Sequence, residues 1–411
     1  MLAAACLSVL LVAPTMASAE EGPDGEPAEE PTERVAGDAL AEARELLPAT
    51  VRNVRVSSAA VDRAEAEIVA LEQTILTNRA RRDQAASDLE RLAVEREELR
   101  EERTSLRDRR HTAGQQAAQL RREQAQLAVA AYVGAGDPAP GLTLDSAEAM
   151  ATGRQQVMME AVDTTIRERL EIAEGEVVAF AARITTTQEE IEAVVLTIDT
   201  TTRIRDEAIA ELAIAEPELP RAQQRFADAF MTAPVAGADF PVVALDAYRS
   251  AADVINAEQA ACNLSWSVLA GIGRVESRHG TYGGSSLRPD GTTTRRIIGI
   301  ALDGSEGVML IPDTDGGALD GDPIYDRAVG PMQFIPSTWR MVRRDGNGDG
   351  RMDPHNLYDA AAAAGAYLCR NHQRLDQPGP LNSALLSYNR SQSYVNTVLA
   401  HRRTYDNLGV G

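Results

Sequence analysis

A single glutamate, Glu276, stands at the end of an apolar pattern that predicts a helix. Ser265 is a residue type that caps helix N-termini, and apolar residues at helical spacing continue from it to Val275. The negative end of the helix dipole and the apolar neighbours both disfavour an ionised carboxylate, so we expect a raised pKa for Glu276. Such a group can donate a proton near neutral pH. The alternative, from local features alone, is a solvated glutamate paired with Arg274 or Arg278.

The segment from residue 345 to residue 356 carries hard oxygen ligands at the spacing of an EF-hand calcium loop. Gly350 allows the sharp turn at position 6. Asn356 replaces the usual bidentate glutamate at position 12, which lowers the ligand charge unless a nearby carboxylate such as Asp359 substitutes. We expect a structural Ca²⁺, and the alternative is a Gly-Asp turn that only resembles such a loop. The candidate metal ligands are Asp345, Asn347, Asp349, Arg351, Asp353 and Asn356.

Four motifs in the C-terminal part occur in the order seen in lytic murein transglycosylases. They are Gly-Ile-Gly-Arg-Val-Glu-Ser-Arg-His-Gly (271–280), Gly-Pro-Met-Gln-Phe-Ile-Pro-Ser-Thr-Trp (330–339), the calcium-like loop, and Ser-Tyr-Asn (387–389) with Tyr394. From about residue 240 to residue 405 the chain resembles the membrane-bound lytic transglycosylase B type, particularly its secreted actinobacterial relatives. The resemblance implies a lysozyme-like α-helical domain that acts on peptidoglycan glycan strands.

The resemblance also implies how such an enzyme works. Glu276 would be the single acid/base that cleaves the bond between N-acetylmuramic acid and N-acetylglucosamine, leaving a 1,6-anhydro product. A muramidase that uses water is an alternative, and it needs a second carboxylate about 5–9 Å away, for which Asp290, Asp303 and Asp326 are candidates. A non-catalytic wall-binding or regulatory protein is another alternative. Family position assigns the substrate cleft to Gln333, Phe334, Ser337, Tyr388, Asn389 and Tyr394, although Phe334 and Tyr394 also suit a hydrophobic core.

Composition and the chain start indicate the compartment. The formal charge is −21 and all 41 basic residues are arginine, which argues against binding to nucleic acid or to an anionic membrane. Residues 1–19 resemble a secretory signal, with a small-residue cleavage site but no basic residue before the apolar run. A lipid anchor on Cys6 is a weaker alternative. We therefore expect a secreted protein of the cell envelope, in which Cys262 and Cys369 form a disulfide rather than two buried thiols.

The predicted fold is mainly all-α. Two long heptad-like stripes, separated by Asp137-Pro138-Ala139-Pro140-Gly141, predict an antiparallel coiled-coil hairpin, and a parallel dimeric coiled coil is the alternative. The hairpin resembles those of secreted wall peptidases and division-associated hydrolase activators, which implies docking to a membrane or divisome complex. The expected order is a signal peptide (1–19), a disordered leader (20–52), the hairpin (53–216) with a short helical tip (about 133–155), a linker (217–239) begun by Pro217 and Pro220, and the transglycosylase domain (240–411) with a loop-rich insertion (285–327).

Overall fold

The computed structural model of the chain describes residues 37–134 and 146–409, so the predicted signal, most of the leader and the centre of the predicted tip lie outside the described residues. The described chain is mostly helical, and the predicted all-α fold class is confirmed. No helix among the described residues is both long and apolar enough to cross a bilayer. The elements are α1 (Asp38–Glu45), α2 (Ala59–Gly134), α3 (Ser146–Thr232), α4 (Val242–Glu258), η1 (Ala260–Cys262), α5 (Trp266–Ser277), η2 (Tyr282–Gly284), β1 (Ile298–Ala301), β2 (Arg327–Val329), α6 (Pro336–Val342), α7 (Leu357–Cys369), α8 (Pro378–Tyr388) and α9 (Gln392–Asp406).

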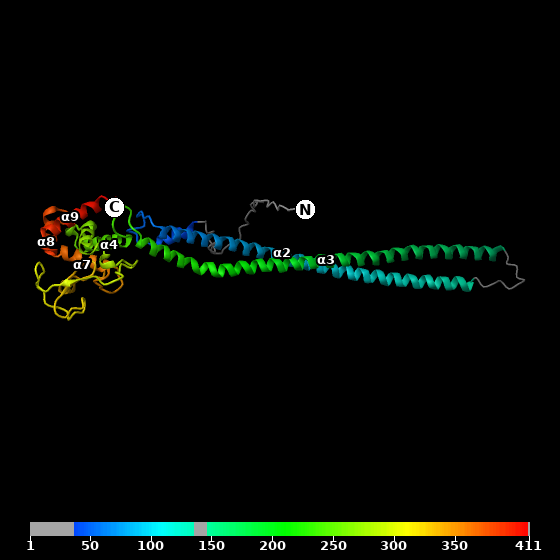
Figure 1. Cartoon of the computed structure of the whole chain (residues 1–411). Helices are drawn as coiled ribbons and strands as arrows, with labels where there is room; N and C mark the ends of the chain where they lie inside the picture. Colours follow the sequence, from blue (N-terminus) through cyan, green and yellow to red (C-terminus); the bar gives the residue numbers. More distant parts are fainter. Residues whose placement is uncertain (1–36, 135–145, 410–411) are drawn as a thin grey trace, which may run out of the picture. The chain divides into compact units, whose positions relative to one another are not determined.

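The two long helices, α2 and α3, pack side by side within one chain (Figure 1). Their cross-helix ion pairs run from Arg79 with Glu216, through Glu102 with Arg183, to Arg121 with Glu174. Residue numbers rise along α2 as they fall along α3, so the helices are antiparallel. The contact between them buries apolar residues at heptad-like spacing, which is where the stability of such a long exposed helix has to come from. These residues include Ile68, Ile75, Leu92, Leu106, Leu120, Ile166 and Ile191.

The predicted linker does not begin at its prolines. Helix α3 runs through Pro217 and Pro220 and ends at Thr232. A proline inside a helix removes one backbone hydrogen bond. Here a buried apolar face continues past both prolines, with Leu219 and Phe226 at most 4% exposed. The packing of this face offsets the lost hydrogen bonds and keeps the chain helical.

The prediction of a disordered leader is wrong for its last part. Helix α1 and the turns after it bury Ala39, Ala43, Leu47 and Val51 in the main core. The carboxylate of Glu72 on α2 accepts hydrogen bonds from the backbone N–H groups of residues 37 and 39, which caps the start of α1. The four-residue spacing of these apolar side chains is a helical signal, but it follows a stretch dominated by Glu and Pro.

The C-terminal part packs α4, α5, α7 and α9 around one core. Small residues let these helices approach closely. A Cβ atom on Gly271 of α5 would lie 2.8 Å from the Val398 carbonyl oxygen on α9, and one on Gly365 of α7 would lie 2.9 Å from Ile255 on α4. Cys262 and Cys369 form a disulfide with Cα atoms 5.6 Å apart across 107 residues of sequence. Closing a loop of that length stabilises a fold by about 4–5 kcal/mol in the chain-entropy account.

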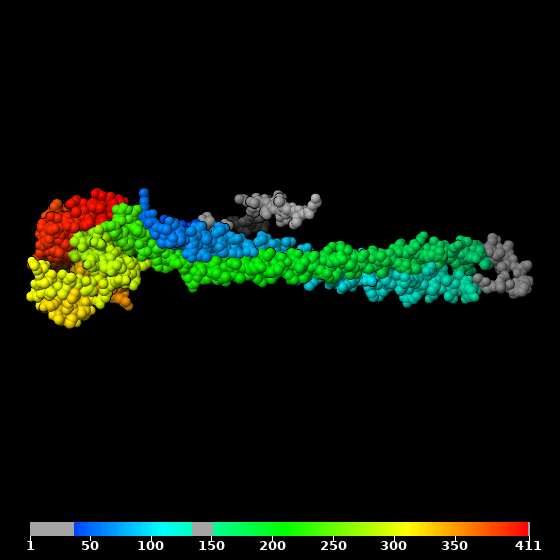
Figure 2. Space-filling model, viewed as in Figure 1, coloured from blue at the N-terminus to red at the C-terminus, as the bar shows by residue number. Residues whose placement is uncertain are grey.

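Between α5 and α6 the chain is built from turns and two short antiparallel strands, β1 and β2. The predicted insertion, residues 285–327, forms most of the yellow surface in Figure 2. In this segment, aspartate side chains accept the backbone N–H groups that a helix or a sheet would otherwise satisfy. Asp313 accepts backbone N–H groups from residues 315–317, and the buried Asp326 accepts both the N–H and the hydroxyl of Thr314. Such bonds hold an irregular segment in one conformation.

Candidate active site

Helix α5 presents Glu276 in its last turn, as the sequence predicts. The Ser265 hydroxyl accepts a hydrogen bond from the backbone N–H of Ser267 and caps the start of the helix. The end is unusual, because Arg278 (φ 54°) and His279 (φ 58°) are both left-handed and precede Gly280 (φ 82°). Non-glycine residues adopt this conformation only where the surrounding structure holds it. The chain therefore reverses sharply just after the glutamate.

Ser277 holds that reversal. Its hydroxyl donates to the Pro331 carbonyl oxygen at 2.6 Å and accepts the backbone N–H of Gly280 at 2.8 Å. Ser277 is 1% exposed, so both bonds are shielded from water. The first motif of the sequence is thereby attached to the second, which starts at Gly330.

The carboxyl group of Glu276 is partly buried and accepts a hydrogen bond at Oε1 from the hydroxyl of Tyr394, at 2.6 Å. Burial raises the pKa of Glu276 to about 7, although the hydrogen bond from Tyr394 acts in the opposite direction. Arg274, the partner expected for a solvated glutamate, lies instead 2.5 Å from Asp239. The Glu276 carboxyl is thus kept protonated up to about neutral pH, which is what a general acid requires.

A network of buried polar side chains lies behind the C-terminal end of α5. The Tyr248 hydroxyl is 3.0 Å from Nδ1 of His279, and Nε2 of His279 is 3.0 Å from the Tyr405 hydroxyl, which donates to Asp239 at 2.9 Å. These bonds all form when Tyr248 donates to Nδ1 and a neutral His279 donates from Nε2. Burial lowers the pKa of His279, in agreement with the neutral ring. These hydrogen bonds hold the His279 side chain and so fix the left-handed turn after Glu276.

Aromatic side chains lie next to the carboxyl group. Tyr388 donates its hydroxyl to the Met332 carbonyl oxygen at 2.7 Å, and its ring packs edge-on against Phe334 with centroids 5.8 Å apart. Burial is the largest cause of a raised pKa for both Tyr388 and Tyr394. The negative charge of Glu276 is the second-largest cause for each tyrosine. The structure therefore brings Tyr388 and Tyr394 together around Glu276. Phe334, which is 3% exposed, serves as a core residue that supports Tyr388.

The other predicted cleft residues hold different positions. Gln333 is left-handed (φ 50°), and its side-chain amide donates to the Gly330 carbonyl oxygen at 2.8 Å, which closes the 330–333 turn. Ser337 is partly exposed in the first turn of α6. Asn389 is exposed beyond α8, and its Oδ1 accepts the backbone N–H of Ser391. No hydrogen bond joins any of these three to Glu276 within the described residues.

Sequence reasoning missed several residues of this site. Tyr367 on α7 packs edge-on against Tyr388 with centroids 5.5 Å apart. Asp239 and Tyr248 precede the first motif, and Tyr405 lies on α9 beyond Tyr394, outside all four motifs. His279, which follows α5 in the first motif, was an available signal, because a buried histidine needs hydrogen-bond partners for its ring nitrogens.

The calcium-like loop is organised by carboxylates. Asp345 accepts the backbone N–H groups of residues 348–350, and Asp349 accepts that of Arg351. Asp359, fully buried, accepts the N–H groups of Gly346 and Asp353. Burial, together with the charges of Asp345 and Asp349, raises the pKa of Asp359 to about 6. A hard cation bound here would offset the repulsion between these three carboxylates.

Asn356, predicted at ligand position 12, has another task. Its Oδ1 accepts the backbone N–H of Tyr358 and caps α7, while its Nδ2 donates to the Asp290 carbonyl oxygen. Asp359 is the residue whose two oxygens face the loop. In the described residues one group of three acidic side chains has ligand atoms all within 4.8 Å of one another, and it lies elsewhere, at Asp313, Asp315 and Asp326.

Comparison with known proteins supports the same class of protein. Residues 325–380 match the family described as Transglycosylase SLT domain. The matched segment contains α6, the calcium-like loop and α7, whereas Glu276 precedes it. The match supports a lytic transglycosylase with peptidoglycan as its substrate. Neither the curated proteins nor the solved structures provide a match to this chain.

Proposed function

We propose that this protein is an exported peptidoglycan lytic transglycosylase of the B-like type, with Glu276 as its single acid/base. The observation that carries the proposal is the partly buried Glu276 carboxyl group, whose pKa is raised to about 7 and whose Oε1 accepts the Tyr394 hydroxyl. The match to a transglycosylase domain supplies the substrate class.

The proposed reaction begins with the protonated carboxyl group. Because Tyr394 donates to Oε1, the proton of Glu276 resides on Oε2 and passes from there to the glycosidic oxygen. The bond between that oxygen and C1 of the muramyl residue breaks. The Glu276 carboxylate then removes the proton of the muramyl 6-hydroxyl, whose oxygen forms the new bond to C1. The carboxyl group ends protonated as it began, and no water is consumed.

A single carboxylate is sufficient in this scheme because the nucleophile belongs to the substrate. A hydrolytic glycosidase holds its second carboxylate at about 5–9.5 Å from the first. The two causes that shift the pKa of Glu276 within the described chain are burial and Tyr394, and neither is a carboxylate. Asp290 bonds to Thr292 and Asp326 to Thr314. Asp303, the third candidate for a second carboxylate, accepts the backbone N–H of Ser305. The products distinguish the two reactions, because only the transglycosylase leaves a 1,6-anhydro end.

We further propose that the signal-like residues 1–19 export the chain and that Ca²⁺ binds at Asp345, Asn347, Asp349 and Asp359. The disulfide between Cys262 and Cys369 supports an oxidising compartment.

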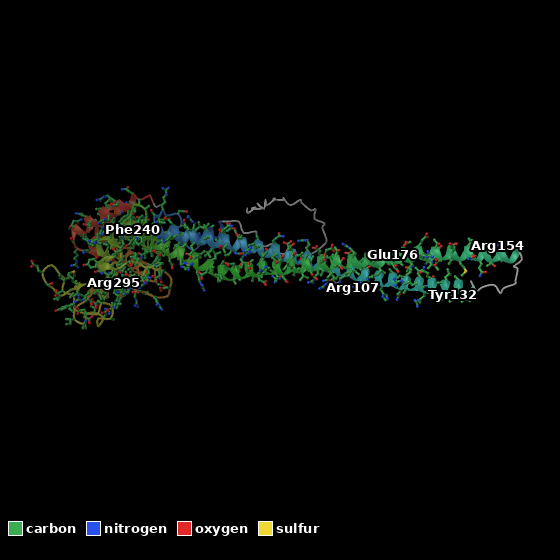
Figure 3. The ribbon with its side chains drawn as sticks, turned by 45° about the vertical axis from the view of Figure 1, so that its right-hand side comes forward. Arg107, Tyr132, Arg154, Glu176, Phe240 and Arg295 are labelled. Carbon is green, nitrogen blue, oxygen red and sulfur yellow. A yellow bond between two sulfur atoms is a disulfide. The ribbon has the colours of Figure 1, made fainter. Side chains whose placement is uncertain are left out.

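The α2–α3 pair is proposed to act as a coiled-coil hairpin that docks to a membrane or divisome complex. At one end of the pair, where Figure 3 labels Tyr132 and Arg154, large apolar side chains are exposed. Tyr132 is 85% exposed, Val157 68% and Met158 71%. A surface of this kind suits protein contact.

The test of this proposal is to replace Tyr132 and Met158 with serine and to follow recruitment of the protein to the septum. We expect recruitment to be lost and digestion of isolated wall to be retained.

The test of the enzymatic proposal is digestion of purified peptidoglycan by the wild type and by Glu276→Gln, with mass spectrometry of the soluble fragments. We expect 1,6-anhydro ends from the wild type and loss of product, by about a thousand-fold, from the variant. Glu306→Gln, a matched change at an exposed carboxylate, is the control. Reducing ends without anhydro ends would establish a muramidase, and an inactive wild type would favour a wall-binding protein.

A further inference from the structure

A polar cavity lies between the loop-rich segment and the calcium-like loop, apart from the residues around Glu276. Its wall includes Arg288, Thr293, Arg296, Asp353 and His355. Its two guanidinium groups outnumber its one carboxylate, Asp353, although the chain as a whole has a formal charge of −21. A wall of this charge attracts an anion.

Neither arginine is neutralised by an acid. Within the described residues, no carboxylate oxygen comes within 4.0 Å of the guanidinium nitrogens of Arg288 or Arg296, whereas Arg327 nearby pairs with Asp322 at 2.9 Å. Arg288 donates to the Thr293 carbonyl oxygen at 3.1 Å, and Arg296 donates from Nε to Nε2 of His355 at 3.1 Å. A guanidinium has five N–H donors. Both groups are thus held in place with donors to spare.

Two wall residues also carry polar atoms without partners. The Nδ1 atom of His355 and the Oγ1 atom of Thr293 are buried and make no hydrogen bond within the described residues. His355 is 8% exposed and Thr293 is 7% exposed. Because Nε2 of His355 accepts from Arg296, a neutral ring carries its proton on Nδ1, so the unpartnered atom is a donor. Both residues line the cavity.

The cavity adjoins the turn that lies beside Glu276. Pro354 lines the cavity, and its carbonyl oxygen packs so closely on Gly330 that a Cβ atom there would lie 1.7 Å from it. Gly330 begins the turn whose next residue, Pro331, accepts the hydroxyl of Ser277. Glu276 and the cavity are therefore attached to the same short turn.

The charge of the wall selects the kind of anion. Two arginines against one carboxylate, Asp353, leave a single net positive charge. This balances one carboxylate better than a phosphate, which carries close to two negative charges. The planar guanidinium also matches the planar carboxylate.

We propose that this cavity binds a free carboxylate of the peptide stem carried by the muramyl residue next to the cleaved bond. The proposal rests on the proposed function, because that function supplies a peptide-bearing glycan. It assigns to Arg288 and Arg296 the selection of peptide-substituted over naked glycan strands.

The experiment compares kcat/KM on glycan strands that keep their peptides with kcat/KM on strands stripped by an amidase. We expect the double variant Arg288→Gln with Arg296→Gln to lose about ten-fold on peptide-bearing strands and nothing on stripped strands, as removal of charge-assisted hydrogen bonds predicts. Arg295→Gln is the matched control, since Arg295 is exposed, adjacent in sequence and labelled in Figure 3, but does not line the cavity. Arg288→Gln alone, at an exposed side chain, covers the case in which the double variant does not fold.

A second arm needs no turnover. The Glu276→Gln protein is titrated with stem peptide released from wall, with the same peptide after amidation of its carboxylates, and with inorganic phosphate. We expect binding of the free-acid peptide only, and its loss on addition of Arg288→Gln. Equal binding of the amidated peptide, tighter binding of phosphate, or an unchanged strand preference in the double variant would overturn the cavity assignment. If the wild type digests neither strand, the proposed function fails, and this arm alone decides the cavity.

Discussion

Replacing Glu276 with glutamine is expected to stabilise the protein above neutral pH. In the folded chain the carboxyl group keeps its proton up to a pH of about 7, whereas in the unfolded chain it ionises near its ordinary value of 4.5. The folded state is therefore favoured below pH 4.5, and this contribution is lost progressively as the pH rises to 7. Glutamine has no proton to lose and retains an oxygen that accepts the Tyr394 hydroxyl.

The size of the effect follows from the two pKa values. A gap of roughly 2.5 pH units at about 1.4 kcal/mol each corresponds to about 3.4 kcal/mol. Glu276 is partly exposed, so solvent reduces this to about 2–3 kcal/mol in the free energy of unfolding at pH 8. At pH 4.5 and below we expect little difference between variant and wild type.

The assay is urea unfolding at pH 4.5 and pH 8, followed by the fluorescence of Trp266 and Trp339. Trp339 is 2% exposed in α6 and reports the core beside the site. Glu306→Gln provides the control for loss of a carboxylate at the surface. A difference between Glu276→Gln and wild type that is the same at both pH values would refute a carboxyl group held neutral by burial.

Three further predictions follow from the same contacts. Tyr394→Phe removes the hydrogen bond that lowers the pKa of Glu276, so the alkaline limb of the kcat/KM profile should move to higher pH while kcat/KM falls about ten-fold; an unmoved limb would separate Tyr394 from the acid. Gly273→Ala places a Cβ atom 2.0 Å from the Tyr248 hydroxyl and should lower the free energy of unfolding by about 2–3 kcal/mol. Gly175→Ala, whose Cβ atom would have nothing within 4 Å, should raise the free energy of unfolding by about 0.5–1 kcal/mol. Calorimetry measures both changes. Calcium at about a hundred times its Kd should stabilise the wild type by about 2.7 kcal/mol, and Asp359→Asn should weaken that response; melting curves that ignore both calcium and chelator would remove the cation.

The parts of the site that follow from local sequence could be predicted. The helix with Glu276 in its last turn depends on a capping serine and apolar spacing within twelve residues, and burial by those neighbours raises its pKa. The role of Tyr394 came from the family resemblance, because nothing near it in sequence points to Glu276. Tyr405 on α9 and Asp239 in the connection between α3 and α4 hold His279, and only tertiary packing brings them together. Pairings across such distances have no periodic signal.

Two predicted boundaries, the start of the linker and the end of the disordered leader, are wrong because tertiary packing outweighs the local sequence signal. The rule that proline ends a helix fails at Pro217 and Pro220 because tertiary burial outweighs a lost hydrogen bond. The leader was assigned by composition, which is dominated by Glu and Pro before residue 37. The apolar stripe from Ala39 to Val51 becomes stable only when α2 and α3 cover it.

The most direct test of the central claim is digestion of peptidoglycan in heavy-oxygen water, with mass spectrometry of the new muramyl ends. A transglycosylase that uses Glu276 alone takes its nucleophile from the muramyl 6-hydroxyl, so we predict anhydro ends that contain no heavy oxygen. Heavy oxygen at the new muramyl C1 would show that water is the nucleophile, and it would contradict the account.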